Sequence, residues 1–359
     1  MKRVLFTAKV VKLHINVFHL PLLRLFKDAG WETAVAAKND YDPKEACVIP
    51  SCDHFYDIDF DRNVFSIKSF RLYRQLKDVI KTGDYDIIHT HTPIVSAFTR
   101  VAARKTGARV IYTAHGFHFF KGAPLRNWLL YYPVEKLCSR WTDLLITINQ
   151  EDYELAERKF HAQKVEMVPG VGIDRKRFLN TVVDRLEKRK EIGVPKDAFV
   201  LFSAGELVKN KNHETVIKAL AALEDPSIHY VIAGEGELKQ DLQKLAGSLG
   251  IGANVHLIGY RKDMAELYKT VDLVIHPSLR EGLPVVVMEA MASGTNTIAS
   301  SVRGNRDLLP KDHLFDCKDV EGIMKKVRDC RQGLIAPVML SEEYSIEKVQ
   351  ERMRELYGI

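Results

Sequence analysis

Cysteine is scarce and unpaired in this chain of 359 residues. Five cysteines occur, an odd number, and no two of them form a Cys-x-x-Cys pair. This pattern argues against a disulfide framework and against a zinc site built from cysteine pairs, and it is typical of reduced thiols in a cytosolic protein. The five residues are Cys47, Cys52, Cys138, Cys317 and Cys330.

Long apolar runs are missing too. Lys9 and Lys12 interrupt the first hydrophobic stretch, so the amino-terminal segment is not expected to be a signal peptide. Nothing further along approaches the roughly 18 apolar residues that a membrane-spanning helix needs. Repeats and low-complexity tracts are also absent. With 46% hydrophobic and 28% charged residues, the composition excludes disordered and fibrous classes and favours a globular protein.

The net charge of +6 is modest, but basic residues recur at helical spacing. A solvated helix face explains that spacing, and so does attraction to anionic lipid headgroups. No nucleic-acid-binding motif accompanies the charge, so nucleic acid is not expected as a partner. The basic residues in question are Lys68, Arg71, Arg74, Lys77 and Lys81.

Strand and helix patterns alternate along the whole chain, which predicts parallel sheets covered by helices. A first domain is expected over residues 1–173 and a second over 174–340, with a final helical segment at 341–359. Residues 174–196, which are charged and end in glycine and proline, are interpreted as the linker and its first helix. Two successive doubly wound domains place a ligand at the carboxyl ends of their strands.

The most informative segment lies between Glu281 and Glu289. A buried strand, VDLVIHPS, is followed by a tight Glu-Gly turn, and a helix is expected to open at Pro284, where a missing N–H costs nothing. Free N–H groups at such a helix start bind phosphate, and flanking carboxylates suit the hydroxyls of a ribose and a sugar. Glutamates at this spacing are often a solvated face, but this context favours a sugar-nucleotide site.

On this segment the sequence resembles the family-four retaining glycosyltransferases of the GT-B fold, whose signature is two glutamates separated by seven residues. The resemblance runs from the first strand to the last helix. It implies two Rossmann-like α/β domains facing a cleft, with a carboxyl-terminal helix crossing back to the first domain. The first domain would bind the acceptor and the second the nucleotide sugar.

The resemblance assigns donor-site roles in the second domain. Lys211 falls at the position of a diphosphate-binding lysine, Glu281 would hold donor-sugar hydroxyls and Glu289 the ribose. Glu206 stands where the family usually has arginine, and a carboxylate cannot neutralise a diphosphate. Arg303 and Arg306 are the expected replacements, with Lys209 a weaker one.

Other donor-site positions follow from the same resemblance. They comprise the strand-end glycines near the diphosphate, a stretch whose backbone frames the nucleobase (uridine more often than guanosine), and N–H groups at the helix start. These residues are Gly205, Gly234, Gly259, Tyr260, Gly282, Leu283, Pro284 and Val285.

In the first domain, His115 matches the family's strand-end histidine, which contacts the donor sugar, whereas His118 is interpreted as structural. His89 and His91 share a strand face, but no third ligand has a suitable spacing, so no metal site is expected there. The family needs no metal cofactor, and the segment 203–307 contains no Asp-x-Asp pair.

Two further groups are assigned to the acceptor and the membrane. In the first strand-to-helix loop, Lys12, His14 and Asn16 replace a glycine-rich turn and are expected to meet the acceptor. In the aromatic segment 116–141, rings and basic tips suit a membrane interface. The residues expected at that interface are Phe119, Phe120, Lys121, Arg126 and Trp128, whereas Leu129, Leu130, Val134 and Leu137 are expected to be buried.

The resemblance is strongest to bacterial enzymes of capsule and exopolysaccharide assembly. It implies a retaining transfer of an N-acetylhexosamine or hexose from a UDP-sugar to a polyprenyl-diphosphate-linked glycan, at the inner face of the cell membrane. No protein nucleophile is evident, and the leaving phosphate would take the acceptor's proton. The alternatives are a UDP-sugar 2-epimerase of the same fold and a weakly active sugar-nucleotide-binding partner, which Glu206 favours.

Overall fold

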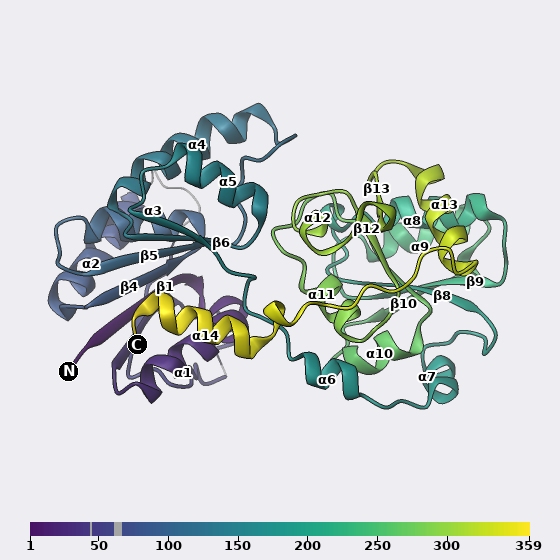
Figure 1. Ribbon diagram of the computed structural model, residues 1–359, viewed down its shortest axis with the longest axis horizontal. Helices are drawn as coiled ribbons and strands as arrows, with labels where there is room; N and C mark the ends of the chain where they lie inside the picture. The colour runs from purple at the N-terminus through teal and green to yellow at the C-terminus, as the bar shows by residue number, and fades with distance from the viewer. Residues whose placement is uncertain (44, 61–66) are drawn as a thin grey trace. The chain divides into compact units, whose positions relative to one another are not determined.

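The computed structural model describes residues 1–43, 45–60 and 67–359, and for residues 67–69 it describes the backbone only. The chain forms two compact units. Unit 1 comprises Met1–Gly172 and Glu347–Ile359, and unit 2 comprises Ile173–Ile346. Each unit is a parallel sheet with helices packed on both faces (Figure 1).

Unit 1 contains a seven-stranded sheet in the order β3-β2-β1-β4-β5-β6-β7. Its strands are β1 Arg3–Val10, β2 Glu32–Lys38, β3 His54–Asp57, β4 Ile87–His91, β5 Arg109–Ala114, β6 Leu144–Thr147 and β7 Lys164–Met167. Its helical elements are the π-helix η1 Val11–His19, α1 Leu20–Asp28, α2 Ile67–Gly83, α3 Pro93–Ala103, α4 Leu125–Cys138, η2 Ser139–Trp141, α5 Gln150–Lys159 and α14, which spans Ile346–Tyr357 and so begins at the last residue of unit 2.

Both faces of this sheet are covered by helices, and successive side chains of β1 point into the two cores alternately. Val4 and Phe6 pack with α1 and α14, whereas Leu5, between them, packs with α2 and α3. Helix α14 contributes Val349 and Met353 to the first of these cores. The carboxyl-terminal helix is therefore a structural part of the amino-terminal unit.

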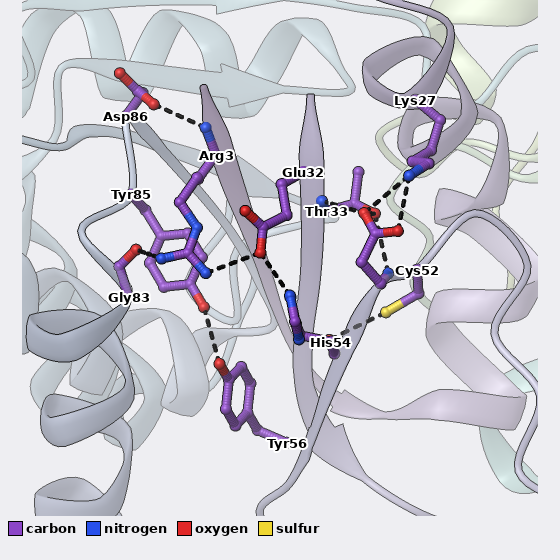
Figure 2. A network of polar contacts seen from close by, with 11 residues as sticks. Arg3, Lys27, Glu32, Thr33, Cys52, His54, Tyr56, Gly83, Tyr85 and Asp86 are labelled. Atoms are coloured by element: carbon purple, nitrogen blue, oxygen red, sulfur yellow. Dashed lines mark hydrogen bonds and ion pairs between the residues drawn. The ribbon is translucent and has the colours of Figure 1, made fainter. Parts of the chain in front are cut away.

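The amino-terminal ends of β1, β2 and β3 are tied together by a polar network (Figure 2). Arg3 Nη2 donates to Glu32 Oε1 at 3.0 Å, and the same carboxylate oxygen pairs with the His54 ring. The backbone N–H of Arg3 donates to Asp86 at 2.7 Å. These bonds fix the amino-terminal edge of the sheet, whereas the candidate functional residues of unit 1 lie at the carboxyl-terminal edge.

Unit 2 contains a six-stranded parallel sheet in the order β10-β9-β8-β11-β12-β13. Its strands are β8 Phe199–Ala204, β9 Ile228–Ala233, β10 Val255–Gly259, β11 Leu273–His276, β12 Thr297–Ser300 and β13 Leu314–Phe315. Its helices are α6 Arg175–Asn180, α7 Arg185–Glu191, η3 Lys209–Lys211, α8 His213–Leu223, α9 Lys239–Ser248, η4 Gly252–Asn254, α10 Met264–Thr270, α11 Val285–Ala292, α12 Asn305–Leu308, η5 Lys311–His313, α13 Val320–Arg331 and η6 Glu342–Tyr344.

The prediction of two doubly wound parallel sheets is confirmed. The segment interpreted as a linker forms α6 and α7 of unit 2. The expected basic helix is α2, whose described basic side chains, Arg71, Arg74, Lys77 and Lys81, are exposed; Ser66 and the side chain of Lys68 lie outside the described residues. None of the described helices is both long enough and apolar enough to cross a membrane.

Candidate functional site

Glu281 is the centre of a polar cluster at the carboxyl-terminal edge of the unit 2 sheet. It lies in the turn between β11 and α11, and its Oε1 accepts from Lys211 Nζ at 2.7 Å. The ring of His276, the last residue of β11, lies 3.0 Å from the same oxygen. The cluster therefore combines a cation, a carboxylate and an imidazole from two loops of one sheet edge.

The charge of this carboxylate is strongly stabilised. Burial disfavours its ionised form, but the hydrogen bond from His276 and the charge of Lys211 outweigh burial and hold the pKa of Glu281 well below its usual range. Glu281 is therefore an acceptor-only group at neutral pH.

Close backbone contacts explain the glycines around the cluster. Gly205, after β8, has φ +147°, and Gly234, after β9, has φ +153°. A Cβ on Gly234 would lie 1.8 Å from the carbonyl oxygen of Gly205, and one on Gly205 would meet the Lys211 side chain at 3.2 Å. Larger residues would push these strand ends apart and displace Lys211.

Helix α11 begins one residue later than predicted. Pro284 has an extended backbone, with ψ 115°, and α11 begins at Val285. Gly304 approaches the turn so closely that a Cβ there would lie 2.3 Å from the carbonyl oxygen of Gly282. The first N–H groups of α11 therefore point from a turn that is held in place by the next loop.

Glu289 lies one turn inside α11. Tyr268 donates its hydroxyl to Glu289 Oε2 at 2.9 Å. Burial raises the pKa of Glu289, although the hydrogen bond from Tyr268 and the charge of Arg177 oppose that shift. The two glutamates of the motif therefore differ in character, because one is locked as an anion and the other is destabilised as one.

The replacements expected for the missing arginine take different positions. Glu206 and Lys209 are exposed. Arg303 is buried, and its Nε donates to the carbonyl oxygen of Glu281 at 3.0 Å. Arg306 is exposed and donates to the carbonyl oxygen of Ser301 at 3.0 Å. Of the three basic residues, Arg303 lies directly against the turn that carries Glu281.

In unit 1, His115 follows β5 and lies in a group of histidines. His115 Nε2 lies 3.3 Å from Nδ1 of His91, the last residue of β4, and His91 stacks on His19 with 3.6 Å between ring centroids. Burial lowers the pKa of His115 to about 3 and that of His14 to about 4, so these rings are neutral. His89 is saturated by Tyr357 and Thr113, which gives it a structural role.

The other two residues predicted to bind the acceptor, Lys12 and Asn16, form side-chain contacts within unit 1. Lys12 Nζ pairs with Glu45 at 2.6 Å. Asn16 donates to the Tyr41 hydroxyl at 2.6 Å and to the carbonyl oxygen of Val48 at 2.9 Å. Instead of a loop, the segment forms the end of β1 and the π-helix η1.

The burial predicted for the aromatic segment 116–141 was right for its basic residues but wrong for Phe119 and for four aliphatic residues of α4. Phe119 is fully buried, and Trp128 packs against it with 5.5 Å between ring centroids. Lys121 and Arg126 are exposed as expected, and Phe120 is half-buried. The aromatic rings fill a small core between β5, β6 and α5, which leaves the leucines of α4 outside. The residues expected inside but found 47% to 68% exposed are Leu129, Leu130, Val134 and Leu137.

Sequence reasoning missed three residues of the unit 2 cluster: His276, Ser278 and Tyr268. Ser278 Oγ lies 3.2 Å from His276 Nε2. A histidine as the last residue of a buried strand, five positions before Glu281, was the available signal. Tyr268 lies on α10, and no sequence spacing connects it to Glu289.

Comparison with known proteins identifies the family of the chain. Residues 17–177 match the family described as Glycosyltransferase Family 4, and residues 184–333 match Glycosyl transferases group 1. The Bacillus subtilis protein EpsD, which carries a glycosyltransferase name, is 41% identical over 371 residues, covering 98% of this chain and 96% of EpsD. An Escherichia coli relative named UDP-Gal:alpha-D-GlcNAc-diphosphoundecaprenol alpha-1,3-galactosyltransferase is 26% identical over 314 residues, covering 82% of this chain and 81% of its own.

Among solved structures, Anabaena Alr3699/HepE in complex with UDP and glucose matches with a TM-score of 0.80 at 18% identity, covering 100% of both chains. WaaG, a glycosyltransferase of lipopolysaccharide biosynthesis, matches with a TM-score of 0.71 at 15% identity, covering 98% of this chain and 99% of WaaG. The fold is thus the GT-B glycosyltransferase fold. By its sequence relatives, the chain is a glycosyltransferase and belongs to glycosyltransferase family 4.

Proposed function

We propose that this enzyme transfers a hexose or N-acetylhexosamine from a UDP-sugar to a polyprenyl-diphosphate-linked glycan, with retention of the anomeric configuration. The observation that carries the proposal is the cluster of Lys211, Glu281 and His276 beside the start of α11. The E. coli relative, whose name gives UDP-Gal and a diphosphoundecaprenol-linked acceptor, supports both the donor class and the acceptor class.

The chemistry required is cleavage of the anomeric C–O bond while negative charge grows on the departing diphosphate. Lys211, Arg303 and the first N–H groups of α11 stabilise that charge electrostatically. Glu281 accepts hydrogen bonds from donor-sugar hydroxyls and keeps Lys211 in position, and Glu289 binds the ribose. His115 contacts the donor sugar, and the leaving phosphate takes the proton of the acceptor hydroxyl. The step needs no metal ion.

A turnover assay with and without lipid acceptor tests this function. The enzyme is incubated with each of several UDP-sugars, alone and with an undecaprenyl-diphosphate-linked sugar, and UDP, epimerised donor and extended lipid are quantified. The proposal predicts extended lipid only when acceptor is present. Epimerised donor without acceptor would instead identify an isomerase. Absence of any product would favour a binding partner with the exposed Glu206 at its phosphate site.

The proposed location is the inner face of the cell membrane, and α4 is the proposed contact. Half of its circumference is exposed and apolar, with Arg126 on that same half. An apolar helix face that also carries a basic residue suits the boundary between headgroups and acyl chains of an anionic leaflet. The exposed apolar residues are Leu125, Leu129, Leu130, Val134 and Leu137.

Replacing Leu129 and Leu130 by glutamine should weaken binding to vesicles that contain anionic phospholipid by at least about tenfold, because each inserted leucine contributes about 1.5–3 kcal/mol. Vesicle sedimentation measures the bound fraction. The matched control is Leu179→Gln with Leu334→Gln, since both of these residues are also at least half exposed, at 50% and 69%. Equal binding by the two double variants would remove α4 from the proposed interface.

A further inference from the structure

Three histidines gather at the carboxyl-terminal edge of the unit 1 sheet. His14 and His19 both lie on η1, and His115 follows β5. In an α-helix, side chains five positions apart would diverge by about 140°. The i→i+5 hydrogen bonding of a π-helix brings them to one side instead. The π-helical geometry of η1 therefore makes His14 and His19 face each other.

The distance between the Nε2 atoms of these two rings is close to that between two ligands of one zinc ion. Nε2 of His14 and Nε2 of His19 lie 3.4 Å apart. Two nitrogens bound at about 2.05 Å to one tetrahedral zinc ion lie about 3.3 Å apart. One potential ligand nitrogen on each of His14, His19 and His115 lies within 4.8 Å of the other two. The three nitrogens are therefore close enough to one another to share one ion.

The same region contains buried nitrogens that the chain itself does not satisfy. Among the described residues, Nδ1 of His19 and Nε2 of His91 are buried and have no hydrogen-bond partner. Neither atom belongs to the Nε2 pair of His14 and His19, but an unpaired buried nitrogen costs free energy, and a water or ion in contact with it would offset that cost. A cavity of about 20 Å³ adjoins the cluster and has room for one water-sized species; its lining includes His19, His91 and His115 but not His14.

A fourth histidine, His91, lies beside the cluster. His91 Nδ1 lies 3.3 Å from His115 Nε2 and can orient that ring from outside the ligand set, as second-layer partners do at known metal sites. Imidazole nitrogens select transition metals such as zinc, whereas calcium and magnesium prefer oxygen ligands.

We propose that His14, His19 and His115 form a three-histidine site for a divalent transition-metal ion, with zinc as the expected occupant and a fourth position open to water or an anion. The ion has no part in the transfer step proposed above. His115 is the one residue that the two proposals share, so they are tested by separate readouts, zinc binding here and turnover there. The site does not include the His89–His91 pair, for which the sequence predicted no metal site, and the two ring nitrogens of His89 lie against Tyr357 and Thr113.

Metal binding to the full chain, purified without a polyhistidine tag and stripped with chelator, tests the site. Zinc is titrated by calorimetry, and cobalt substitution is followed by visible absorption. We expect one equivalent of zinc, the absorption of tetrahedral cobalt, and a rise in melting temperature with zinc. His14→Ala should weaken zinc binding by at least about 100-fold, since loss of an outer partner alone costs 10–100-fold. His115→Asn should act in the same direction and serves if His14→Ala misfolds.

The matched control is His256→Ala. His229 and His256 form a histidine pair in unit 2, with 2.9 Å between Nδ1 and Nε2, but no third histidine, cysteine or carboxylate joins them among the described residues. This variant should bind zinc as the wild type does. Absence of stoichiometric zinc in the wild type would overturn the site. So would wild-type affinity in both His14→Ala and His115→Asn.

Discussion

Replacing Glu281 by glutamine is expected to lower kcat by about 10²–10³, the loss typical when one preorganised electrostatic group is removed from an active site. Glutamine keeps the shape of the side chain but loses the charge that holds Lys211 Nζ at 2.7 Å and the His276 ring at 3.0 Å. Lys211 then has no fixed position from which to meet the departing diphosphate. Steady-state kinetics with a UDP-sugar and a lipid-linked acceptor measures the effect.

Glu351→Gln is the matched control for this variant. Glu351 forms an ion pair with Lys348 on α14 at 2.7 Å, but both side chains are more than half exposed. Exposed pairs of this kind contribute about 0–1 kcal/mol to stability. Turnover should therefore stay at the wild-type value. If Glu281→Gln also turned over normally, the site would have to lie elsewhere in the chain.

A second large effect is expected on stability, at the buried ion pair of Arg100 and Glu135. Arg100 Nη2 lies 2.6 Å from Glu135 Oε2, and both side chains are buried. Tyr112 donates its hydroxyl to Glu135 Oε1 at 3.0 Å, and burial raises the pKa of that hydroxyl so that it stays protonated. Arg100→Met leaves a buried carboxylate without its cation, which should lower the free energy of unfolding by about 3–5 kcal/mol.

Urea unfolding followed by tryptophan fluorescence measures this loss in the relevant unit, because the chain has only three tryptophans, Trp31, Trp128 and Trp141, and all belong to unit 1. The double variant Arg100→Met/Glu135→Leu removes both charges and should recover about 1–3 kcal/mol. If the double variant were as unstable as the sum of the two single variants, the two side chains would be acting independently.

Much of the fold could be predicted because its signals are local. Alternating strand and helix patterns gave both parallel sheets, and the turn at Glu281 before an apolar helix gave the edge of unit 2 that carries Lys211. What was missed depends on contacts between distant segments. The partner of Glu289 is Tyr268 on another helix. The leucines of α4 are exposed because the aromatic residues of the same helix, Trp128, Tyr131 and Tyr132, pack against the core beneath it.

The histidine cluster also could not be predicted, because it depends on backbone geometry that the sequence does not reveal. Each of His14, His19 and His115 is unremarkable by spacing, and only the π-helical geometry of η1 places the first two on one side. A π-helix is rare, and the spacing of residues 11–19 gives no sign of its i→i+5 hydrogen bonding. Sequence spacing alone therefore predicted no third ligand in this region.

The central claim, that unit 2 binds a UDP-sugar through Lys211 and Glu281, is tested most directly by thermal unfolding in the presence of nucleotides. UDP, GDP, ADP and a panel of UDP-sugars are compared, with Lys211→Ala measured in parallel. A ligand at 100 times its Kd stabilises the folded state by about 2.7 kcal/mol. We expect a rise in melting temperature with UDP and a larger one with a particular UDP-sugar, both lost in Lys211→Ala. No rise with any nucleotide, or an equal rise in Lys211→Ala, would contradict it.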